Sequence, residues 1–259
     1  MNIKPIALGA RLRGVPSIHT LGFKPVFEAY TPQEQRLILE AEKIYYPTAF
    51  YADLFNAMGK PTFPSFHTYK FAMDKIKQTA IFHMLGIPHP KTRVFYGETQ
   101  KKTILDFFSF PFIAKKARGS ARGRGVFLIH NREDLALYLK HHSPAYIQEY
   151  LPIDRDMRII IMGKKIRLAF WRVGDPDNFK TNLSQGGAVC FDSLPREALD
   201  LAERTALSCG WDDVGIDMVM HGGRPYVLEG NMKYGTKGFH TAGIDYKTML
   251  AGLILKGEL

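Results

Sequence analysis

The stretch VGIDMVMHGGRPYVLEGN, from Val214 to Asn231, decides how the rest of the chain is interpreted. It predicts two apolar strands joined by a turn at Gly222-Gly223. The polar exceptions are Asp217 in the first strand and Glu229 and Asn231 in the second. Because side chains two apart on a strand share a face, Glu229 and Asn231 point the same way. Hard cations such as Mg²⁺ prefer such oxygen ligands, usually one or two carboxylates together with substrate phosphates.

Whether Asp217 meets Glu229 depends on the register of this hairpin. Residues that lie opposite each other across a hairpin share a face. A tight two-residue turn places Asp217 opposite Leu228 and separates the two carboxylates, whereas an odd loop or a β-bulge brings Asp217 to Glu229. The alternative is that both carboxylates are ordinary strand charges paired with Arg or Lys. The residues alone leave both interpretations open.

The apolar pattern becomes regular from residue 68 onward. It predicts a series of strands and helices: a helix from about 68 to 85, a strand at 92–96, a helix at about 99–108, strands at 111–115 and 126–129, a helix from Asn131, a strand ending at Tyr150, a hairpin over 156–173 and a helix at 195–209. Antiparallel hairpins interleaved with helices favour a layered α+β fold over a doubly wound parallel sheet.

The first part of the chain is different, because seven of the 15 prolines fall within residues 1–64. We expect irregular backbone there, with one helix that begins at a capping box formed by Thr31 and Glu34 and runs to about Lys43. The predicted organisation is a short N-terminal segment, 1–67, and a core, 68–259, in which about 90–150 and 151–259 form two subdomains.

A basic, glycine-rich stretch begins at Lys115 and reads KKARGSARGRGV. Residues 107–132 hold six Lys or Arg and no Asp or Glu. Gly119, Gly123 and Gly125 let the backbone turn and approach a ligand closely, so the stretch can fold over phosphates with its amides and Lys115. Its spacing matches neither a Walker A loop nor a dinucleotide fingerprint. A basic hairpin tip that contacts RNA or nothing is an equal alternative.

Composition excludes several classes of protein. The 259 residues are 46% hydrophobic and carry a net charge of +10, which indicates a folded chain with an anionic partner. No apolar run approaches the roughly 18 residues of a membrane span, and Arg11 and Arg13 interrupt any signal-peptide core. Cys190 and Cys209 form neither a disulfide framework nor a zinc motif, so we expect a cytoplasmic protein.

In chain order, eight motifs resemble those of the ATP-grasp superfamily, and within it the RimK-like carboxylate–amine ligases. They are Asp74-Lys75; LGIPHPKT at 85–92; FPFIAK at 110–115 with Gly119-Ser120 and Gly123-x-Gly125-Val126; QEYL at 148–151; Asp156-x-Arg158; NFKTN at 178–182 with Gly186-Gly187; GID at 215–217; and LEGN at 228–231. The resemblance covers roughly residues 68–255.

The resemblance implies an ATP-grasp fold, in which two α+β subdomains clasp ATP, and it implies a role for each matched residue. The residues that it implies for nucleotide binding are Lys75, Lys115, Gly119, Ser120, Gly123, Gly125, Gln148, Glu149, Tyr150, Leu151 and Asp156, the last of which would contact the ribose. The resemblance implies that Asp217, Glu229 and Asn231 bind two Mg²⁺ or Mn²⁺ ions. The catalytic residues near the acyl phosphate are Arg172, Lys180 and Asn182.

Three departures from the family pattern stand out. The N-terminal segment is short, Lys180 replaces the usual arginine, and Met232-Lys233-Tyr234-Gly235 replaces the usual Pro-Gly next to the expected substrate pocket. An arginine-to-lysine change converts a bidentate anion contact into a point charge.

The implied function is an ATP-dependent ligase that joins a carboxylate to an amine through an acyl phosphate and releases ADP and phosphate. Its expected partners are ATP and two substrates, for example glutamate or a protein C-terminus, and the family often forms homo-oligomers. No membrane or nucleic-acid partner is expected. The alternative is an ATP- or RNA-binding module of the same fold without ligase turnover.

Overall fold

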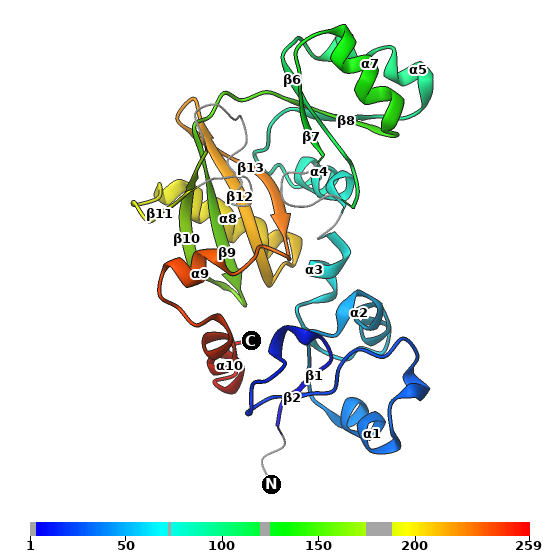
Figure 1. The fold of residues 1–259 in the computed structure, drawn as a ribbon, viewed down its shortest axis with the longest axis vertical. Helices are drawn as coiled ribbons and strands as arrows, with labels where there is room; N and C mark the ends of the chain where they lie inside the picture. The colour runs from blue at the N-terminus through cyan, green and yellow to red at the C-terminus, as the bar shows by residue number, and fades with distance from the viewer. Residues whose placement is uncertain (1–3, 72–73, 120–124, 175–187) are drawn as a thin grey trace.

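The computed structural model describes residues 4–71, 74–119, 125–174 and 188–259. Within these ranges the chain forms three sheets, which lie one above another in Figure 1. An N-terminal sheet is at the bottom, a five-stranded central sheet is in the middle, and a smaller four-stranded sheet, the lid, is at the top.

The central sheet is antiparallel, with the order β11-β10-β9-β12-β13. Its strands are β9 (Arg155–Met162), β10 (Lys165–Val173), β11 (Ala188–Cys190), β12 (Asp213–His221) and β13 (Arg224–Asn231). Helix α8 (Arg196–Cys209) packs on one face, against alternate β9 residues such as Ile159 and Ile161. The other face, with Ile160 and Met162, is turned toward the N-terminal segment. The predicted end of α8 is confirmed, because Gly210 adopts a φ of 67° as its cap.

The lid is also antiparallel, with the order β5-β8-β6-β7. It consists of β5 (Thr92–Phe95), β6 (Phe112–Lys115), β7 (Val126–Ile129) and β8 (Ala145–Glu149), with α5 (Gly97–Lys101), α6 (Ile104–Phe107) and α7 (Arg132–His141). The strands predicted at 92–96, 111–115 and 126–129 agree with β5, β6 and β7 to within one residue at each end. The single helix expected over about 99–108 is two short helices, separated at Lys102-Thr103.

Two helices connect the N-terminal segment to the lid, α3 (Phe66–Phe71) and α4 (Lys75–Met84) (Figure 1). The side chain of Asp74 caps α4 by accepting from the amide of Lys77. The expectation of one helix from about 68 to 85 is therefore wrong at its start, because a new helix begins after this cap.

The N-terminal segment is more regular than its prolines predicted. Four two-residue strands form a parallel sheet in the order β2-β1-β3-β4: β1 (Ile6–Ala7), β2 (His19–Thr20), β3 (Ile44–Tyr45) and β4 (Thr62–Phe63). The 3₁₀ helices η1 (Ala10–Leu12) and η2 (Phe27–Ala29) and the helices α1 (Pro32–Glu40) and α2 (Thr48–Ala57) complete it. The capping box at Thr31 and Glu34 is present, and α1 ends at Glu40 instead of near Lys43. Strands of two residues are too short to show an alternating pattern, which is why the sequence did not predict them.

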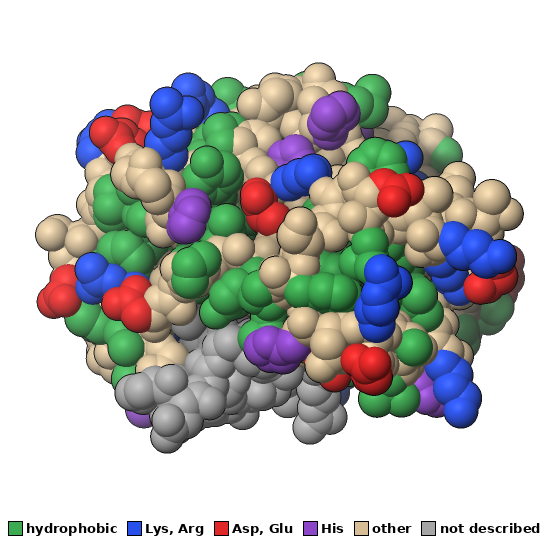
Figure 2. Space-filling model, turned by 90° about the horizontal axis from the view of Figure 1, so that it is seen from above, with side chains coloured by type: hydrophobic (Ala, Val, Ile, Leu, Met, Phe, Trp, Pro, Cys, Tyr) green, Lys and Arg blue, Asp and Glu red, His purple; other side chains and the backbone are tan. Residues whose placement is uncertain are grey.

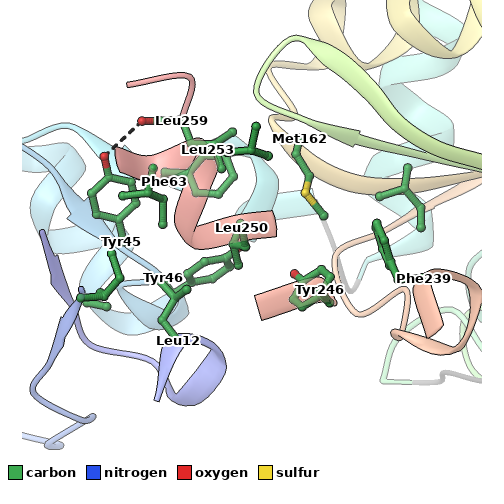
Figure 3. Packing of buried hydrophobic residues seen from close by; sticks show 14 of the residues in the cluster. Leu12, Tyr45, Tyr46, Phe63, Met162, Phe239, Tyr246, Leu250, Leu253 and Leu259 are labelled. Atoms are coloured by element: carbon green, nitrogen blue, oxygen red, sulfur yellow. Dashed lines mark hydrogen bonds between the residues drawn. The ribbon is translucent and has the colours of Figure 1, made fainter. Parts of the chain in front are cut away.

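The N-terminal sheet and the central sheet share one hydrophobic cluster, shown in Figure 3. Helices α9 (Lys237–Thr241) and α10 (Tyr246–Leu255) lie between them. Leu250 and Leu253 of α10 pack with Tyr45 and Phe63 on one side, and Met162 belongs to the same cluster on the other. The N-terminal segment is thus packed onto the central sheet at β9 and β10, and β9 is the neighbour of the strand that carries Asp217. Among the described residues, no helix is long and apolar enough to cross a membrane.

Candidate active site

A β-bulge decides the geometry of the hairpin formed by β12 and β13. The turn is a tight one, with His221 opposite Arg224 and positive φ angles at Gly222 and Gly223. That turn alone would place Asp217 opposite Leu228. The register shifts between Met218, which pairs with Val227, and Asp217, which therefore lies opposite Glu229. The bulge therefore brings the two carboxylates to one face, as the metal-site interpretation required.

The three expected metal ligands are in direct contact. Asn231 Nδ2 donates to Glu229 Oε1 over 2.8 Å and to Asp217 Oδ2 over 3.3 Å. Asp217 is buried in an inner strand of the sheet, while Glu229 and Asn231 lie on the edge strand β13. Two carboxylates and an amide thus converge at one point of the central sheet.

Cationic side chains surround these oxygens. Arg158 forms two hydrogen bonds with Asp217, and Arg172 NH2 lies 3.1 Å from Asp217 Oδ2. Lys75 Nζ, at the start of α4, lies 2.5 Å from Glu229 Oε2. The alternative interpretation from the sequence, carboxylates paired with Arg or Lys, is correct about the pairing. The pairs are nevertheless clustered and mostly buried, unlike the solvated pairs of a sheet surface.

The donor set suits a divalent cation that also binds phosphate. Among the described residues, no group of three or more His, Cys, Asp or Glu side chains could hold a metal by itself. Mg²⁺ commonly takes one or two carboxylates and completes its coordination with water and phosphate oxygens. Asp217 and Glu229, joined through Asn231, fit that requirement in the presence of a nucleotide.

Lys115 brings a further positive charge from the lid. It ends β6 and is buried, and its carbonyl accepts from the hydroxyl of Tyr138 over 2.7 Å. Burial lowers the pKa of Lys115 to about 8, an effect that the charge of Glu229 opposes and that of Lys75 reinforces. Burial alone would raise the pKa of Glu229, but Lys75 and Lys115 outweigh burial and hold it below its ordinary value.

The glycine-rich stretch is held against the start of α4 at its first described end. Arg118 Nε donates to Asp74 Oδ2 over 2.9 Å, and the amide of Lys75 donates to the carbonyl of Ala117. Gly119 and Gly125 both have positive φ angles, 67° and 86°. These contacts place the lid next to the start of α4. Ser120 and Gly123 lie outside the described residues.

Four of the expected nucleotide-binding residues, 148–151, lie at the end of β8 and just beyond it. Gln148 is buried and donates to Thr92 Oγ1 over 2.9 Å. The carboxylate of Glu149 accepts from the amide of Lys91. Tyr150 and Leu151 continue the chain beyond the strand and are half-buried. This strand end leads directly into β9 of the central sheet, so it lies at the junction between the two subdomains.

Asp156 and Arg172 form a buried pair on neighbouring strands. Arg172 Nε donates to Asp156 Oδ1 over 2.7 Å, and its NH2 group binds the second carboxylate oxygen. Asp156 therefore orients an arginine that also contacts Asp217. Its expected contact with the ribose stays a prediction. Lys180 and Asn182, the other two expected catalytic residues, lie outside the described residues.

Three arginines lie on the hairpin of β9 and β10, Arg158, Arg167 and Arg172, and the resemblance gave Arg158 no role beyond its place in the Asp156-x-Arg158 motif. The structure separates them, because Arg167 pairs with Glu258 at the surface, whereas Arg158 and Arg172 converge on Asp217. The spacing of the residues could have indicated this grouping. Residues 156 and 158 are two apart on β9 and therefore share a face, and Arg172 lies opposite Asp156 on β10.

Comparison with known proteins places this geometry in a family. Residues 72–254, more than half of the chain, match the RimK-like ATP-grasp domain. A ribosomal protein bS6–L-glutamate ligase of Escherichia coli (strain K12 / DH10B) is 27% identical over 254 residues, which are 95% of this chain and 80% of that protein. Beta-citrylglutamate synthase B of Homo sapiens is 30% identical over 166 residues, or 61% of this chain. The matched part is 43% of that synthase, less than half of its length.

Solved structures show the same fold. A RimK domain ATP-grasp protein from Sphaerobacter thermophilus DSM 20745 superposes with a TM-score of 0.71 at 18% identity, covering 96% of this chain and 98% of that one. The ATP-grasp ligase PsnB, complexed with a minimal precursor, gives a TM-score of 0.72 at 16% identity and covers all of both chains. These likenesses confirm the expected α+β, ATP-grasp fold. The family match over residues 72–254 shows that this chain belongs to the RimK-like ATP-grasp family.

Proposed function

We propose that this protein is an ATP-dependent carboxylate–amine ligase. The observation that carries the proposal is the convergence of Asp217, Glu229 and Asn231 with Lys75 and Lys115, which come from three separate parts of the fold. Oxygen ligands for a cation and lysines for phosphates therefore face one space. Positioning and neutralising charge are the main tasks of a phosphoryl-transfer site.

In the proposed reaction, a substrate carboxylate attacks the γ-phosphorus of ATP and ADP leaves. An amine then attacks the carbonyl carbon of the acyl phosphate and phosphate leaves, so that an amide forms. Lys75 and Lys115 hold the phosphates, and Arg172, fixed by Asp156, faces the transferring group. Asp217, Glu229 and Asn231 would hold two Mg²⁺ or Mn²⁺ ions, which would neutralise phosphate charge. Lys180 and Asn182 are the other two proposed catalytic residues.

The lid completes the nucleotide site in this proposal. Its glycine-rich stretch, including Gly119, Ser120, Gly123 and Gly125, covers the phosphates and keeps water from the acyl phosphate. Residues 148–151 receive the adenine. The link between Arg118 and Asp74 supports this arrangement, because it ties the stretch to the helix that carries Lys75.

The names of the relatives indicate an acidic substrate. Both a bS6–L-glutamate ligase and a citrylglutamate synthase carry glutamate in their names. We infer that one substrate here is glutamate or a protein C-terminus, that the protein acts in the cytoplasm and that it forms a homo-oligomer.

The experiment is a measurement of ADP release with Mg²⁺ ATP, candidate acids and candidate amines. We expect release that requires both substrates and that is lost in Asp217→Asn and Glu229→Gln. Asp200→Asn is the matched control, since Asp200 pairs only with Arg196 on the surface of α8 among the described ion pairs. Full turnover in both site variants would refute the assignment of the metal ligands.

Figure 2 bears on the RNA-binding alternative. On the described part of the face it shows, Lys and Arg side chains are interspersed with Asp and Glu and form no continuous basic stripe. A steep loss of RNA affinity with salt, independent of Glu229, is the result that would favour the alternative.

A further inference from the structure

Arg11 links the N-terminal segment to three elements around the active site. Its NH1 group donates to Asp213 Oδ2 over 3.3 Å and to the hydroxyl of Tyr246 over 2.8 Å. Its NH2 group donates to the carbonyl of Met232 over 3.3 Å. One guanidinium, 24% exposed, therefore contacts β12, α10 and the loop that follows β13. A rigid, planar group with five donors is suited to holding several partners at once.

Tyr234, in that same loop, is held by β12 at its hydroxyl and by β9 at its carbonyl. Its hydroxyl donates to Asp213 over 2.5 Å, and its carbonyl accepts from Arg158 NH1 over 3.0 Å. Its ring lies over Gly215, where an added Cβ would come within 2.5 Å of the Cβ of Tyr234. The loop thus lies on the strand between Asp213 and Asp217, in a place that only glycine leaves free.

The loop is directly connected to the metal ligands. Asn231, which contacts both carboxylates, is the residue before Met232. At the other end, Arg158 donates to Tyr234 and also forms two hydrogen bonds with Asp217. A displacement of the loop would therefore move Asn231 and Arg158 together.

We propose that Arg11 is a positioning residue of the active site, which fixes the 232–234 loop and through it the orientation of Asn231 and Asp217. The inference rests on the proposed function. Arg11 has no contact with Asp217, Glu229 or Asn231 among the interactions of the described residues, and it acts through Tyr234 and Arg158. The N-terminal segment, which supplies Arg11, then contributes to metal binding as well as to the core.

The experiment measures Mn²⁺ affinity by electron paramagnetic resonance in the presence of adenylyl imidodiphosphate, with full-length wild type, Arg11→Met and Arg11→Lys. Loss of a group that orients metal ligands typically weakens metal binding about 10- to 100-fold. We expect Arg11→Met to weaken Mn²⁺ binding about tenfold, with less than a twofold change in affinity for the analogue without metal. Arg11→Lys should recover part of the loss, because it keeps the charge beside Asp213.

Tyr45→Phe is the matched control. The hydroxyl of Tyr45 donates to the carbonyl of Leu259 over 3.1 Å, so the variant also loses a hydrogen bond between the N-terminal segment and the C-terminal part of the chain. It leaves the 232–234 loop intact and should bind Mn²⁺ like the wild type. Urea unfolding of each variant separates a loss of stability from a loss of positioning.

Two results would overturn the inference. One is Mn²⁺ binding by Arg11→Met equal to that of Tyr45→Phe. The other is a higher KM for a substrate with unchanged Mn²⁺ affinity, which would make Arg11 a substrate ligand. A wild type that binds Mn²⁺ with the analogue but never releases ADP would instead refute the ligase proposal alone. A wild type that binds no Mn²⁺ with the analogue would refute both.

Discussion

Two buried aspartates on one strand, Asp213 and Asp217, show how surroundings separate a structural carboxylate from a candidate ligand. They lie four residues apart on the same face of β12, and each meets an arginine. Asp217 has two arginines and an amide donor around it. Asp213 has one arginine and the hydroxyl of Tyr234, and burial raises its pKa to about 6 against the opposing effect of Arg11.

The difference concerns charge. Around Asp217 and Glu229, cations outnumber carboxylates, and Lys75 and Lys115 hold the pKa of Glu229 below its ordinary value. Around Asp213, neutral phenols dominate, and Tyr46, Tyr234 and Tyr246 all lie within the same cluster. A desolvated carboxylate with a single cation is costly to ionise, and its hydrogen bonds serve the fold.

The largest expected effect is on turnover, which should separate variants of Asp217 from variants of Asp213. Asp217→Asn should reduce ADP release on the order of a thousandfold, as expected for the loss of charge stabilisation in a phosphoryl-transfer site, and it should also lower stability, because Arg158 and Arg172 lose a charged partner. Asp213→Asn should reduce the free energy of unfolding by about 1–3 kcal/mol with a much smaller loss of turnover, because it weakens the partner of the partly buried Arg11 guanidinium. Steady-state kinetics and urea unfolding of both variants provide the measurement. Equal losses of turnover at matched stability would erase the distinction.

The pH dependence of stability should have opposite signs at the two kinds of carboxylate. The folded-state pKa of Asp213, about 6, lies above its ordinary value of 3.8. Its stabilising contribution is therefore complete below pH 3.8 and declines as the pH rises through 6, by about 3 kcal/mol. The pKa of Glu229 is lowered from 4.5, so its contribution is present above pH 4.5 and is lost as the pH falls. Urea unfolding of wild type, Asp213→Asn and Glu229→Gln between about pH 2.5 and 7.5 tests the signs, and parallel slopes would contradict them.

A smaller effect is expected at Gly215, which lies between the two aspartates. The Cβ added by Gly215→Ala would lie 2.5 Å from Cβ of Tyr234 and 2.9 Å from Cδ of Arg158. Overpacking of this kind typically costs about 1–3 kcal/mol of stability. Gly252→Ala is the control, because nothing lies within 4 Å of its added Cβ in α10; it should leave stability unchanged or raise it slightly. Similar melting temperatures for the two variants would show that Tyr234 does not need this close approach.

The smallest expected effect is proton uptake by Lys115, one of the cations near Glu229. With a pKa of about 8, Lys115 is only partly protonated at pH 8. Bound phosphates should raise that pKa, so nucleotide binding should take up about half a proton at this pH. Calorimetry in two buffers of different ionisation enthalpy measures the uptake. Lys115→Arg, which stays charged, is the control and should show none; uptake that persists in this variant would assign it to another group.

Prediction from the sequence succeeded where the local signal was strong. The lid strands have the predicted bounds to within a residue, and α7 begins after its Asn131 cap and α8 ends at Gly210 as expected. The break before α4 was missed, although Asp74 is a recognisable cap. The N-terminal sheet was missed because its strands pair through residues far apart in the chain, with too few residues per strand to reveal a period.

The sequence by itself determined the element types, the caps, the turn at Gly222-Gly223 and the identity of the side chains that gather at the site. Only the tertiary structure decided the register that brings Asp217 to Glu229, because a bulge depends on how β12 is packed between β9 and β13. It also decided that Arg11 reaches Asp213, 202 positions away in the chain. Periodicity and capping are local properties of the backbone, whereas contacts over such distances exist only once the sheets have packed together.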